Sequence, residues 1–343
     1  MKKLRVGVIG ATGYTGEEIV RLLARHPRVE VTYASGKEER NLRLQEIFPY
    51  LQGRIDLECR AFSPEEALKE CDFVFLSLPH TVSMRVAPLF LKAAKPVVDT
   101  SADYRLKDVK IYERFYKTPH ADPVYLKRAV YGLPELHRAR IKKAKLIANP
   151  GCYPTAAILG VLPGFSDGLF HPKGIVIDAK SGVTGAGRKA DKALLFSEVN
   201  ESFKAYKVFE HQHVPEMNQE LTQWAKKAVD VVFVPHLLPL NRGILSTIYV
   251  SLAGRISTAS LVERYRSFYA QEPFVRVLEN GALPEVKHAA HTNFCHIGLR
   301  VDETKKLAVI VTAIDNLGKG AAGQAIQNMN LMRGFDEREG LYS

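Results

Sequence analysis

One cysteine lies where a thiol can act as a nucleophile. Cys152 follows an apolar run and the turn at 149–151, and it precedes a small-residue helical pattern at 156–162. A strand that stops at this turn would place the thiol at a helix N-terminus, where unpaired N–H groups and the helix dipole favour a thiolate. A lone cysteine is more often a small buried core residue. The remaining chemistry in the chain decides between the two interpretations.

The best general acid/base candidate is His211, in the segment HQHVPE at 211–216. On an extended segment alternate side chains share one side, so His213 would lie beside it, and Glu216, one turn further on, would orient one of the rings. Three interpretations stay open: a Cys–His pair, a metal site with the glutamate as third ligand, and structural histidines at a helix start. The histidines at 288, 291 and 296 have no carboxylates at ligand spacing, and we predict no metal site.

The N-terminal segment predicts a dinucleotide-binding unit. A short apolar strand at 4–9 runs directly into a glycine-rich turn and a helix at 17–25. Gly10 permits a tight turn, Gly13 lets the backbone approach a diphosphate, and Gly16 lets the helix pack on the strand, with the helix N-terminus facing the phosphates. The predicted cofactor contacts in this turn are Gly10, Ala11, Thr12, Gly13, Tyr14, Thr15 and Gly16.

The end of the second predicted strand, at 29–33, indicates which dinucleotide is bound. Proteins that bind the unphosphorylated cofactor usually have an acid there for the ribose hydroxyls. This chain instead has Ser35, Lys37 and Arg40. A hydroxyl and two cations without an acid suit a 2′-phosphate, so we predict NADP. The alternative is that both cations are only loop charges.

Two more segments of the first half are candidates for ligand contact. The continuous apolar run at 73–78 is typical of a buried parallel strand, and Pro79 follows at its carboxyl end, where ligands bind in such sheets. After a strand at 96–99, Ser101 and Arg105 are suited to an anionic substrate group, although a loop ion pair would use the same residues. The aromatic-rich stretch 112–131 is expected to be irregular, and 131–135 to form a lid.

The pattern changes after residue 155. Strand-like runs at 174–180, 231–234, 244–252, 294–301 and 307–313 alternate with few helices, which predicts an α+β domain with a mixed, largely antiparallel sheet. The predicted fold class is therefore α/β, a Rossmann-type doubly wound sheet plus this second domain. We place the first domain at 1–149, completed by a C-terminal helix within 316–343. The substrate and oligomerisation domain spans 150–315.

Composition excludes several classes of protein. The formal charge of +11 is dispersed over 343 residues without a nucleic-acid-binding motif. No apolar run reaches the length of about 18 residues that a membrane span needs. The four widely spaced cysteines argue against a disulfide framework and a zinc knuckle. We expect a cytoplasmic protein with no nucleic-acid or membrane partner.

The chain contains several long motifs, which are GATGYTG, SADYRL, YGLPEL, NPGCYPT, SGVTGAGR, HQHVPE, PHLLPLNRGI and AIDNLGKGAAGQA. They resemble those of the N-acetyl-gamma-glutamyl-phosphate reductase family, which is related to aspartate-semialdehyde dehydrogenase. The resemblance runs almost from end to end of the chain.

The resemblance implies roles for individual residues. Cys152 is the expected nucleophile, His211 the acid/base and Glu216 a supporting acid. Asn316 is expected near the nicotinamide, and Ser181 and Gly182 of the glycine-rich loop complete the predicted cofactor contacts. The expected substrate or phosphate contacts are Ser101, Arg105, Arg188 and Arg242. Relatives often have Ser-Arg where this chain has Ser35-Gly36-Lys37, which makes Lys37 the candidate for the 2′-phosphate.

The resemblance also implies the reaction. NADPH would reduce N-acetyl-L-glutamyl 5-phosphate to N-acetyl-L-glutamate 5-semialdehyde and phosphate through a cysteine thioester, in arginine biosynthesis. The alternative substrate is a glutamyl or aminoadipyl phosphate linked to a carrier protein, and the tyrosine and proline after Cys152 favour the free substrate. A non-enzymatic NADP sensor would keep the fold with an unreactive thiol. A homodimer or homotetramer is the expected assembly.

Overall fold

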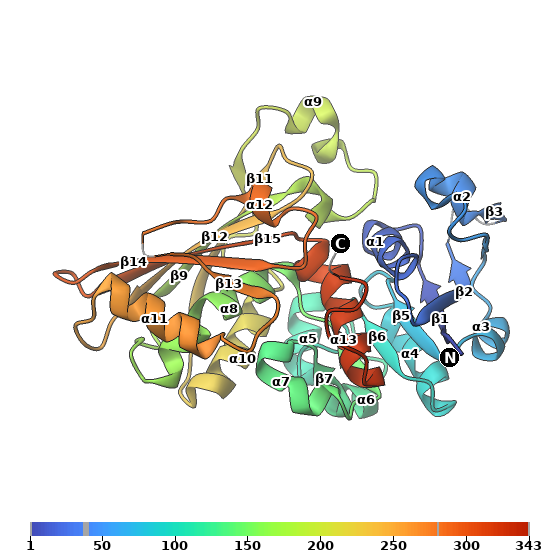
Figure 1. The fold of residues 1–343 in the computed structure, drawn as a ribbon, viewed down its shortest axis with the longest axis horizontal. Coiled ribbons are helices and arrows are strands. Elements are labelled where there is room, and N and C mark those ends of the chain that lie inside the picture. The colour runs from blue at the N-terminus through green and yellow to red at the C-terminus, as the bar shows by residue number, and fades with distance from the viewer. Residues whose placement is uncertain (1, 37–40, 280, 342–343) are drawn as a thin grey trace. The chain divides into compact units, whose positions relative to one another are not determined.

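The computed structural model describes residues 2–36, 41–279 and 281–341 and divides the chain into two compact units. The first unit comprises residues 1–150 and 321–343, and the second comprises residues 151–320 (Figure 1). The chain therefore passes from the first unit to the second once, and returns once.

The first unit is built on an eight-stranded sheet in the order β3-β4-β2-β1-β5-β6-β8-β7. All neighbouring strands are parallel except β3 and β4 at one edge. The reversal of strand order on either side of β1 makes this a doubly wound sheet. The strands are β1 (Leu4–Ile9), β2 (Val29–Ser35), β3 (Leu42–Arg43), β4 (Glu58–Arg60), β5 (Phe73–Leu76), β6 (Val97–Asp99), β7 (Val130–Tyr131) and β8 (Leu146–Ala148).

Helices connect these strands, as parallel pairing requires. Their starts follow local chemistry: the Ser63 hydroxyl accepts a hydrogen bond from the Glu66 amide at one, and the Asp122 carboxylate accepts from the Tyr125 amide at another. The helices are α1 (Tyr14–Leu23), α2 (Leu44–Ile47), the 3₁₀ turn η1 (Pro49–Leu51), α3 (Pro64–Glu70), α4 (Ser83–Lys92), α5 (Val109–Tyr116), α6 (Pro123–Arg128), α7 (Pro134–Ile141) and, from the end of the chain, α13 (Gly323–Arg333).

The stretch 112–135 was predicted wrongly as an irregular cover and a lid. It forms most of α5, then α6, β7 and the start of α7, and Tyr112 and Leu133 are buried. The Gly132 amide donates to the Ala148 carbonyl, and the Gly132 carbonyl accepts from Asn328. These bonds fix the segment at the edge of the sheet, because a backbone that leaves a short strand must find new partners.

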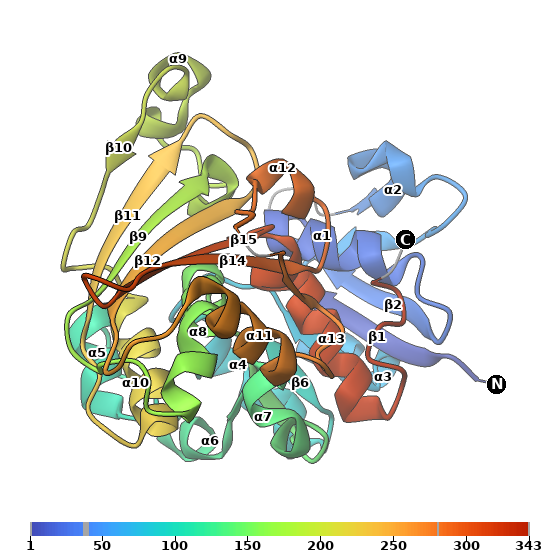
Figure 2. The same ribbon diagram turned by 60° about the vertical axis from the view of Figure 1, so that its left-hand side comes forward.

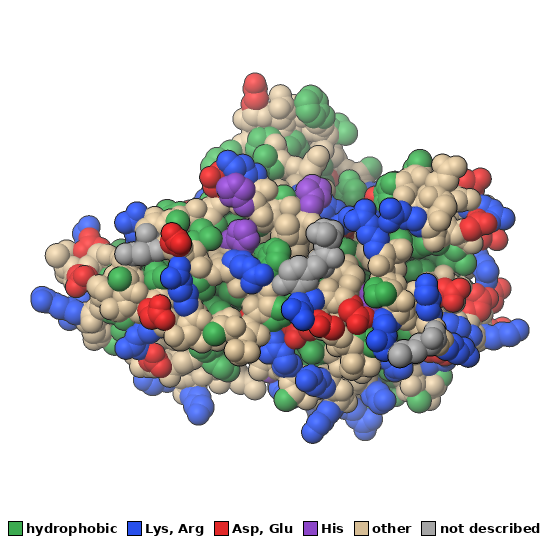
Figure 3. All heavy atoms as spheres, viewed as in Figure 1, with side chains coloured by type: hydrophobic (Ala, Val, Ile, Leu, Met, Phe, Trp, Pro, Cys, Tyr) green, Lys and Arg blue, Asp and Glu red, His purple; other side chains and the backbone are tan. Residues whose placement is uncertain are grey.

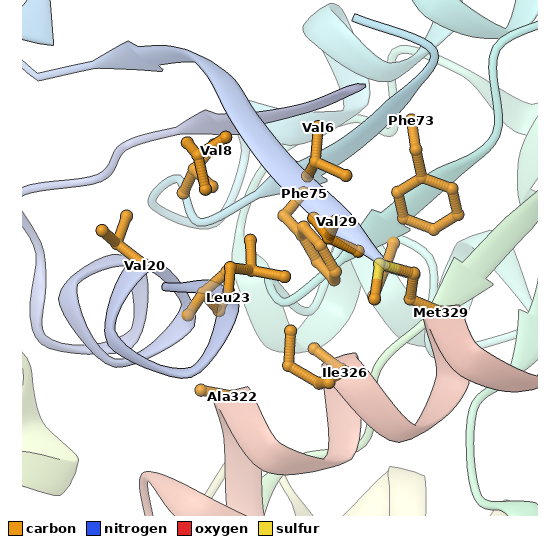
Figure 4. Close-up of a cluster of buried hydrophobic side chains, with 14 of the residues drawn as sticks. Val6, Val8, Val20, Leu23, Val29, Phe73, Phe75, Ala322, Ile326 and Met329 are labelled. Atoms are coloured by element: carbon orange, nitrogen blue, oxygen red, sulfur yellow. The ribbon is translucent and has the colours of Figure 1, made fainter. Parts of the chain in front are cut away.

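The core of the first unit joins segments from both ends of the chain (Figure 4). Helix α13 packs beside α1 and against the sheet, so the unit is completed by residues after 320. Burial of these apolar side chains removes them from water, which is the main favourable term in folding. The contacting side chains in Figure 4 include Val6, Val8, Val20, Leu23, Val29, Phe73, Phe75, Ala322, Ile326 and Met329.

The second unit has a seven-stranded mixed sheet in the order β10-β11-β9-β12-β15-β14-β13 (Figure 2). Only the pairs β11–β9 and β14–β13 are parallel. The predicted fold class, a doubly wound sheet plus a second domain with a largely antiparallel sheet, is confirmed. The strands are β9 (Ile175–Gly182), β10 (Lys204–Ala205), β11 (Val231–Leu238), β12 (Ile244–Ser251), β13 (Val275–Val277), β14 (Cys295–Asp302) and β15 (Leu307–Ile314).

Helices α8, α10 and α11 pack on this sheet (Figures 1 and 2). Burial alternates along the strands, as expected for a sheet with one covered face: Ile177 and Ile248 are buried, whereas Val232 and Tyr249 are each 37% exposed. The helices are α8 (Cys152–Ser166), α9 (Phe196–Val199), α10 (Val214–Ala225), α11 (Thr258–Phe268), α12 (Val286–Ala289), the 3₁₀ turns η2 (Val183–Ala186) and η3 (Lys192–Leu194), and the π turn η4 (Gly318–Ala322).

Truncation of a side chain on α13 should destabilise the first unit. Ile326 is fully buried in its core, so Ile326→Ala should lower the free energy of unfolding by about 2–5 kcal/mol through lost burial and the cavity left behind. Arg333→Ala, at the exposed end of the same helix, is the control and should change it by less than about 0.5 kcal/mol. Urea unfolding of both variants measures the difference, and equal losses would contradict the packing of α13.

Candidate active site

Cys152 is the first residue of α8, with Gly151 at the N-cap. Pro150 has no N–H to satisfy, and the Gly151 amide donates to Glu216 Oε1 at 2.8 Å. The Thr155 amide and hydroxyl both bond the Gly151 carbonyl, which closes the first turn. Cys152 is partly exposed, whereas the other three cysteines are buried. The thiol therefore lies at the positive end of a 15-residue helix, where a thiolate is stabilised.

His211 lies in an aromatic enclosure next to this helix start. Its ring contacts Tyr153, Tyr206 and Phe233, with centroids at 5.6, 5.6 and 5.3 Å. Tyr153 follows Cys152 directly, and its hydroxyl is 3.2 Å from that of Tyr206. The Cys152 thiol is close enough to Tyr206 to contribute, after burial, to raising the Tyr206 pKa to about 12. Cys152 and His211 thus share one tyrosine environment within the second unit.

Burial determines the protonation state of His211. The enclosure lowers the pKa of His211 to about 4, with a smaller contribution from the positive charge of Lys207. The ring is therefore neutral at neutral pH. Nδ1 accepts a hydrogen bond from the His213 amide at 3.1 Å, which assigns the ring proton to Nε2. His211 is thus arranged to donate a hydrogen bond from Nε2.

Glu216 is buried on the first turn of α10 and accepts from the backbone beside the cysteine. The sequence predicted that it would orient a histidine. Glu216 Oε1 accepts from the Gly151 amide, so it fixes the turn that carries the nucleophile, and the orienting of a histidine stays a prediction.

Three loops of the second unit meet at Asn316. Asn316 Oδ1 accepts from the Gly243 amide at 2.7 Å, and Asn316 Nδ2 donates to Thr184 Oγ1 at 2.9 Å. Gly182 bonds the Gly243 carbonyl through its amide. A Cβ on Gly320 would lie only 2.8 Å from the Cys152 Cβ, so the segment after Asn316 packs directly on the cysteine.

Of the residues predicted around the cysteine, several come together in the second unit. Ser181 is buried beside Gly182, and Arg242 Nη1 is 3.2 Å from Asp315 Oδ2. Arg188 lies in an exposed segment beyond η2. Residues that the sequence interpretation passed over are Tyr153, Tyr206, Asp315 and Gly320. Tyr206 lies outside the quoted motifs, whereas Tyr153 lies inside NPGCYPT, and Asp315 and Gly320 lie inside AIDNLGKGAAGQA.

The glycine-rich turn of the first unit has the geometry of a dinucleotide cradle. Gly10 has φ +87°, and a Cβ there would lie 2.2 Å from the Ser77 carbonyl oxygen. A Cβ on Gly16 would lie 2.1 Å from the Gly10 carbonyl oxygen. Gly13 is the N-cap of α1 and has no protein atom nearer than 3.8 Å to such a Cβ. The helix start is therefore open to a ligand while the two flanking glycines close the turn.

The other predicted cofactor residues of this unit lie at the carboxyl ends of the strands. The Ser35 carbonyl, at the end of β2, accepts from the Gly10 and Ala11 amides. Pro79 follows β5 on the same edge. Lys37 and Arg40 lie outside the described residues.

Ser101 and Arg105 lie in a buried polar network. The Ser101 hydroxyl donates to Asp99 Oδ2 at 2.7 Å and accepts from the Asp103 amide. Arg105 Nε donates to the Asn149 carbonyl at 2.7 Å, and an Nη atom donates to the Thr100 carbonyl. Burial, with the neighbouring Asp103, raises the pKa of Asp99 to about 7. Both predicted substrate residues thus make contacts that fix the loop before the cysteine turn.

The surface charges, the helices and the grouping of possible metal ligands can be compared with the predicted partners. On the face drawn in Figure 3, Lys and Arg side chains of the described residues are interspersed with Asp and Glu. Among the described residues, no helix combines the length and apolar character of a membrane span. Within the same residues, no three His, Cys, Asp or Glu side chains are grouped to hold a metal ion.

Comparison with known families assigns both units to one class. The family described as "Semialdehyde dehydrogenase, NAD binding domain" matches residues 5–144, and "Semialdehyde dehydrogenase, dimerisation domain" matches residues 152–316. The fold is that of aspartate semialdehyde dehydrogenase II from Vibrio cholerae, with a TM-score of 0.74 at 17% identity, over 97% of this chain and 99% of that one. The enzyme from Candida albicans, solved with NADP, gives 0.66 at 16% identity over 97% and 99%. The protein is therefore a semialdehyde-dehydrogenase-type oxidoreductase that acts on the aldehyde group with a nicotinamide cofactor.

Curated relatives narrow the class. N-acetyl-gamma-glutamyl-phosphate reductase of Geotalea daltonii is 51% identical over 99% of this chain and 98% of its own length. The enzyme of the same name from Symbiobacterium thermophilum is 50% identical over 98% and 97%. The chain belongs to the N-acetyl-gamma-glutamyl-phosphate reductase family, as the sequence motifs predicted.

The depressed pKa of His211 predicts acid sensitivity. A histidine in the unfolded chain titrates near 6.5, so between pH 6.5 and about 4 the unfolded state binds more protons and stability falls as the pH falls. Replacement by glutamine removes this contribution. From pH 7 to 5 the unfolding free energy of His211→Gln should therefore fall by about 1–2 kcal/mol less than that of the wild type. Urea titrations at both pH values measure it, with His171→Gln at an exposed position as control; identical losses in all three proteins would refute the assignment.

Proposed function

We propose that this protein catalyses the NADPH-dependent reduction of N-acetyl-L-glutamyl 5-phosphate to N-acetyl-L-glutamate 5-semialdehyde and phosphate, in arginine biosynthesis. The observation that carries the proposal is the placement of Cys152 at the N-terminus of α8, in the tyrosine environment of a neutral His211. The relatives named for this activity support the choice of substrate.

The residues of the first unit suit a dinucleotide. The turn from Gly10 to Gly16 would hold the diphosphate at the N-terminus of α1, because a helix N-terminus favours anions and Gly13 leaves room for one. The absence of an acid at Ser35 supports a 2′-phosphate, and hence NADP. When bound, the cofactor supplies the hydride that reduces the acyl carbon.

The second unit supplies the nucleophile. The Cys152 thiolate adds to the acyl carbon of the acyl phosphate, a C–S bond forms, and the C–O bond to phosphate breaks with release of inorganic phosphate. The product on the enzyme is a thioester, whose carbon is reduced to the level of a thiohemiacetal. The thiohemiacetal then collapses, expels the thiolate and leaves the aldehyde. A thiolate suits both roles because it is a strong nucleophile and a good leaving group.

His211 acts on the oxygen of the reacting carbon. Its Nε2–H would donate a hydrogen bond to the alkoxide oxygen that develops after reduction, and the bond weakens as the carbonyl forms again. The neutral ring at neutral pH fits this role, because imidazole can then donate this hydrogen bond without a costly buried charge at rest. Glu216 keeps the turn before Cys152 in position through the Gly151 amide.

Removal of the thiol should abolish the reaction. Cys152→Ala should lower kcat by roughly 10³-fold or more, because no thioester forms. Cys295→Ala, a buried cysteine of β14, is the control and should keep near-normal turnover. The assay follows NADPH oxidation with N-acetylglutamyl phosphate, together with iodoacetamide labelling. Near-normal turnover in Cys152→Ala would refute the mechanism, and an inert thiol in an inactive wild type would support an NADP sensor.

A methyl group on Gly13 should block the cofactor without disturbing the fold. No protein atom lies within 3.8 Å of the added Cβ, so Gly13→Ala should unfold at the wild-type temperature. The methyl would meet the diphosphate and raise the Kd for NADPH about tenfold or more, or about 1.4 kcal/mol. Gly254→Ala, in open space in the second unit, is the control. Fluorescence titration measures the Kd for NADPH. A wild-type Kd in Gly13→Ala would contradict the proposed binding of the diphosphate at this turn.

Two kinetic comparisons test the form of the substrate and the choice of cofactor separately. Tyr153 and Pro154 after the nucleophile favour a free acyl phosphate over one linked to a carrier protein. Kinetics with each form decides between them, and a higher kcat/KM for the linked form would establish the alternative. A preference for NADH over NADPH would overturn the interpretation of Ser35.

The uncovered face of the second sheet supports a homo-oligomer. Val232 and Tyr249 are each 37% exposed there, and the partly buried Val176 and Val234 lie on the same face. Large exposed apolar patches commonly mark interfaces. We place a second copy of the chain on this face, which gives a homodimer or a homotetramer built from it, and mass measurement in solution tests the assembly.

A further inference from the structure

A buried carboxylate at the end of β15 has no part in the reaction scheme above. Asp315 is fully buried, and all its described partners lie in the second unit. Oδ1 accepts from the Leu317 and Gly318 amides at 2.8 and 3.0 Å. Oδ2 accepts from the His291 amide and from Arg242 Nη1 at 3.2 Å. Burial of a charge is costly unless it is paired and hydrogen-bonded, so the four donors define where this carboxylate and its partners lie.

One carboxylate oxygen shapes the wall beside the nucleophile. By accepting from two successive amides, Oδ1 caps the turn that begins at Gly318, as aspartate does at turns. The Asp315 carbonyl accepts from the Gly320 amide at 2.9 Å. Gly320 in turn packs on Cys152 so closely that a Cβ would lie 3.2 Å from the Cys152 Cα. Asp315 therefore sets the position of the backbone against which the cysteine rests.

The other oxygen holds a cation. Arg242 is 17% exposed at its side chain and pairs with Oδ2 through one Nη atom. The next residue, Gly243, donates its amide to the Asn316 side chain at 2.7 Å. The segment 242–243 is therefore bound by two consecutive residues, 315 and 316. A guanidinium held by an ion pair with a buried carboxylate keeps a defined position and direction, which suits the binding of a carboxylate or phosphate.

We propose that Asp315 is a positioning residue of the active site, which fixes Arg242 as a binding group for the anionic acyl phosphate and holds the 318–320 turn against Cys152. The inference rests on the proposed function. Asp315 is buried and acts on the substrate only through Arg242 and on the thiol only through the turn.

Asp302 offers a matched comparison. It ends β14, and its Oδ1 accepts from the Thr304 and Lys305 amides at 3.0 and 3.1 Å, so it caps a turn in the same way. Its carboxylate also pairs with a cation, Lys305. The turn between β14 and β15 that it caps contains no predicted site residue. A general effect of losing a turn-capping aspartate would therefore appear in both Asp315 and Asp302 variants.

The first test is Asp315→Asn beside Asp302→Asn. Asparagine keeps an oxygen for the Leu317 and Gly318 amides but turns an N–H toward Arg242, which displaces the guanidinium. KM for N-acetylglutamyl phosphate should rise about tenfold or more, whereas kcat should fall less than about threefold. The Kd for NADPH should stay unchanged, and Asp302→Asn should leave all three constants at wild-type values. A folded Asp315→Asn enzyme with a wild-type KM would overturn the proposal.

The second test shows whether Asp315 acts through Arg242. In the Arg242→Gln background the cation is already lost, so adding Asp315→Asn should change KM by less than about twofold. A merely structural role would instead give the same factor in both backgrounds, and that result would overturn the proposal. Arg242→Gln alone leaves the Asp315 carboxylate buried without its cation. The double variant has no carboxylate there, so it should unfold at a higher temperature than Arg242→Gln.

A further variant tests the proposal if Asp315→Asn folds poorly. Asp315→Glu keeps the charge but lengthens the side chain by one methylene, so it should fold, raise KM and slow the alkylation of Cys152 by iodoacetamide. Unchanged KM and alkylation would overturn the proposal. Cys152→Ala separates this inference from the proposed function: if that variant is inactive and the Asp315 variants behave like wild type, only the positioning role fails.

Discussion

The hydrogen bond from the Gly151 amide to Glu216 fixes the start of α8, and the chemistry of the second unit depends on it. A helix dipole stabilises a thiolate only if the first turn is formed at the thiol, and the first turn here has no side-chain cap of its own. The Glu216 carboxylate, from α10, instead accepts from the amide of the N-cap residue Gly151. On the other side of Pro150, Asn149 is held by Asn328, Arg105 and the Ala321 carbonyl within the first unit. Each unit therefore anchors one end of the turn that precedes the nucleophile.

Burial explains why the site contains groups of unusual character. His211 is enclosed by three aromatic rings, and this enclosure disfavours its charged form. Four donors converge on the buried Asp315 carboxylate. The site thus combines a neutral imidazole with a buried carboxylate held by hydrogen bonds. Both arise from the packing of segments that are distant in sequence.

Elements with strong local signals were predicted well from the sequence. The apolar run of β5 and the glycine turn before α1 each depend on a few adjacent residues. The stretch 112–135 was predicted wrongly, although Asp108 and Asp122 cap its helices, because the aromatic residues suggested a cover rather than a packed face. The burial of Ser101 and Arg105, and the contacts of Asp315 with residues 242 and 291, depend on tertiary structure. No local pattern of residues encodes them.

The division of the first unit into two chain segments has a consequence for biosynthesis. Residues 322–331 complete its core, yet they leave the ribosome after the whole of the second unit has been made. Until then the sheet face that receives α13 exposes apolar side chains of β1 and β5. The second unit can fold earlier, because its sequence is continuous from 151 to 320. The nucleophile would thus acquire its helix and its histidine before the nucleotide-binding unit is finished.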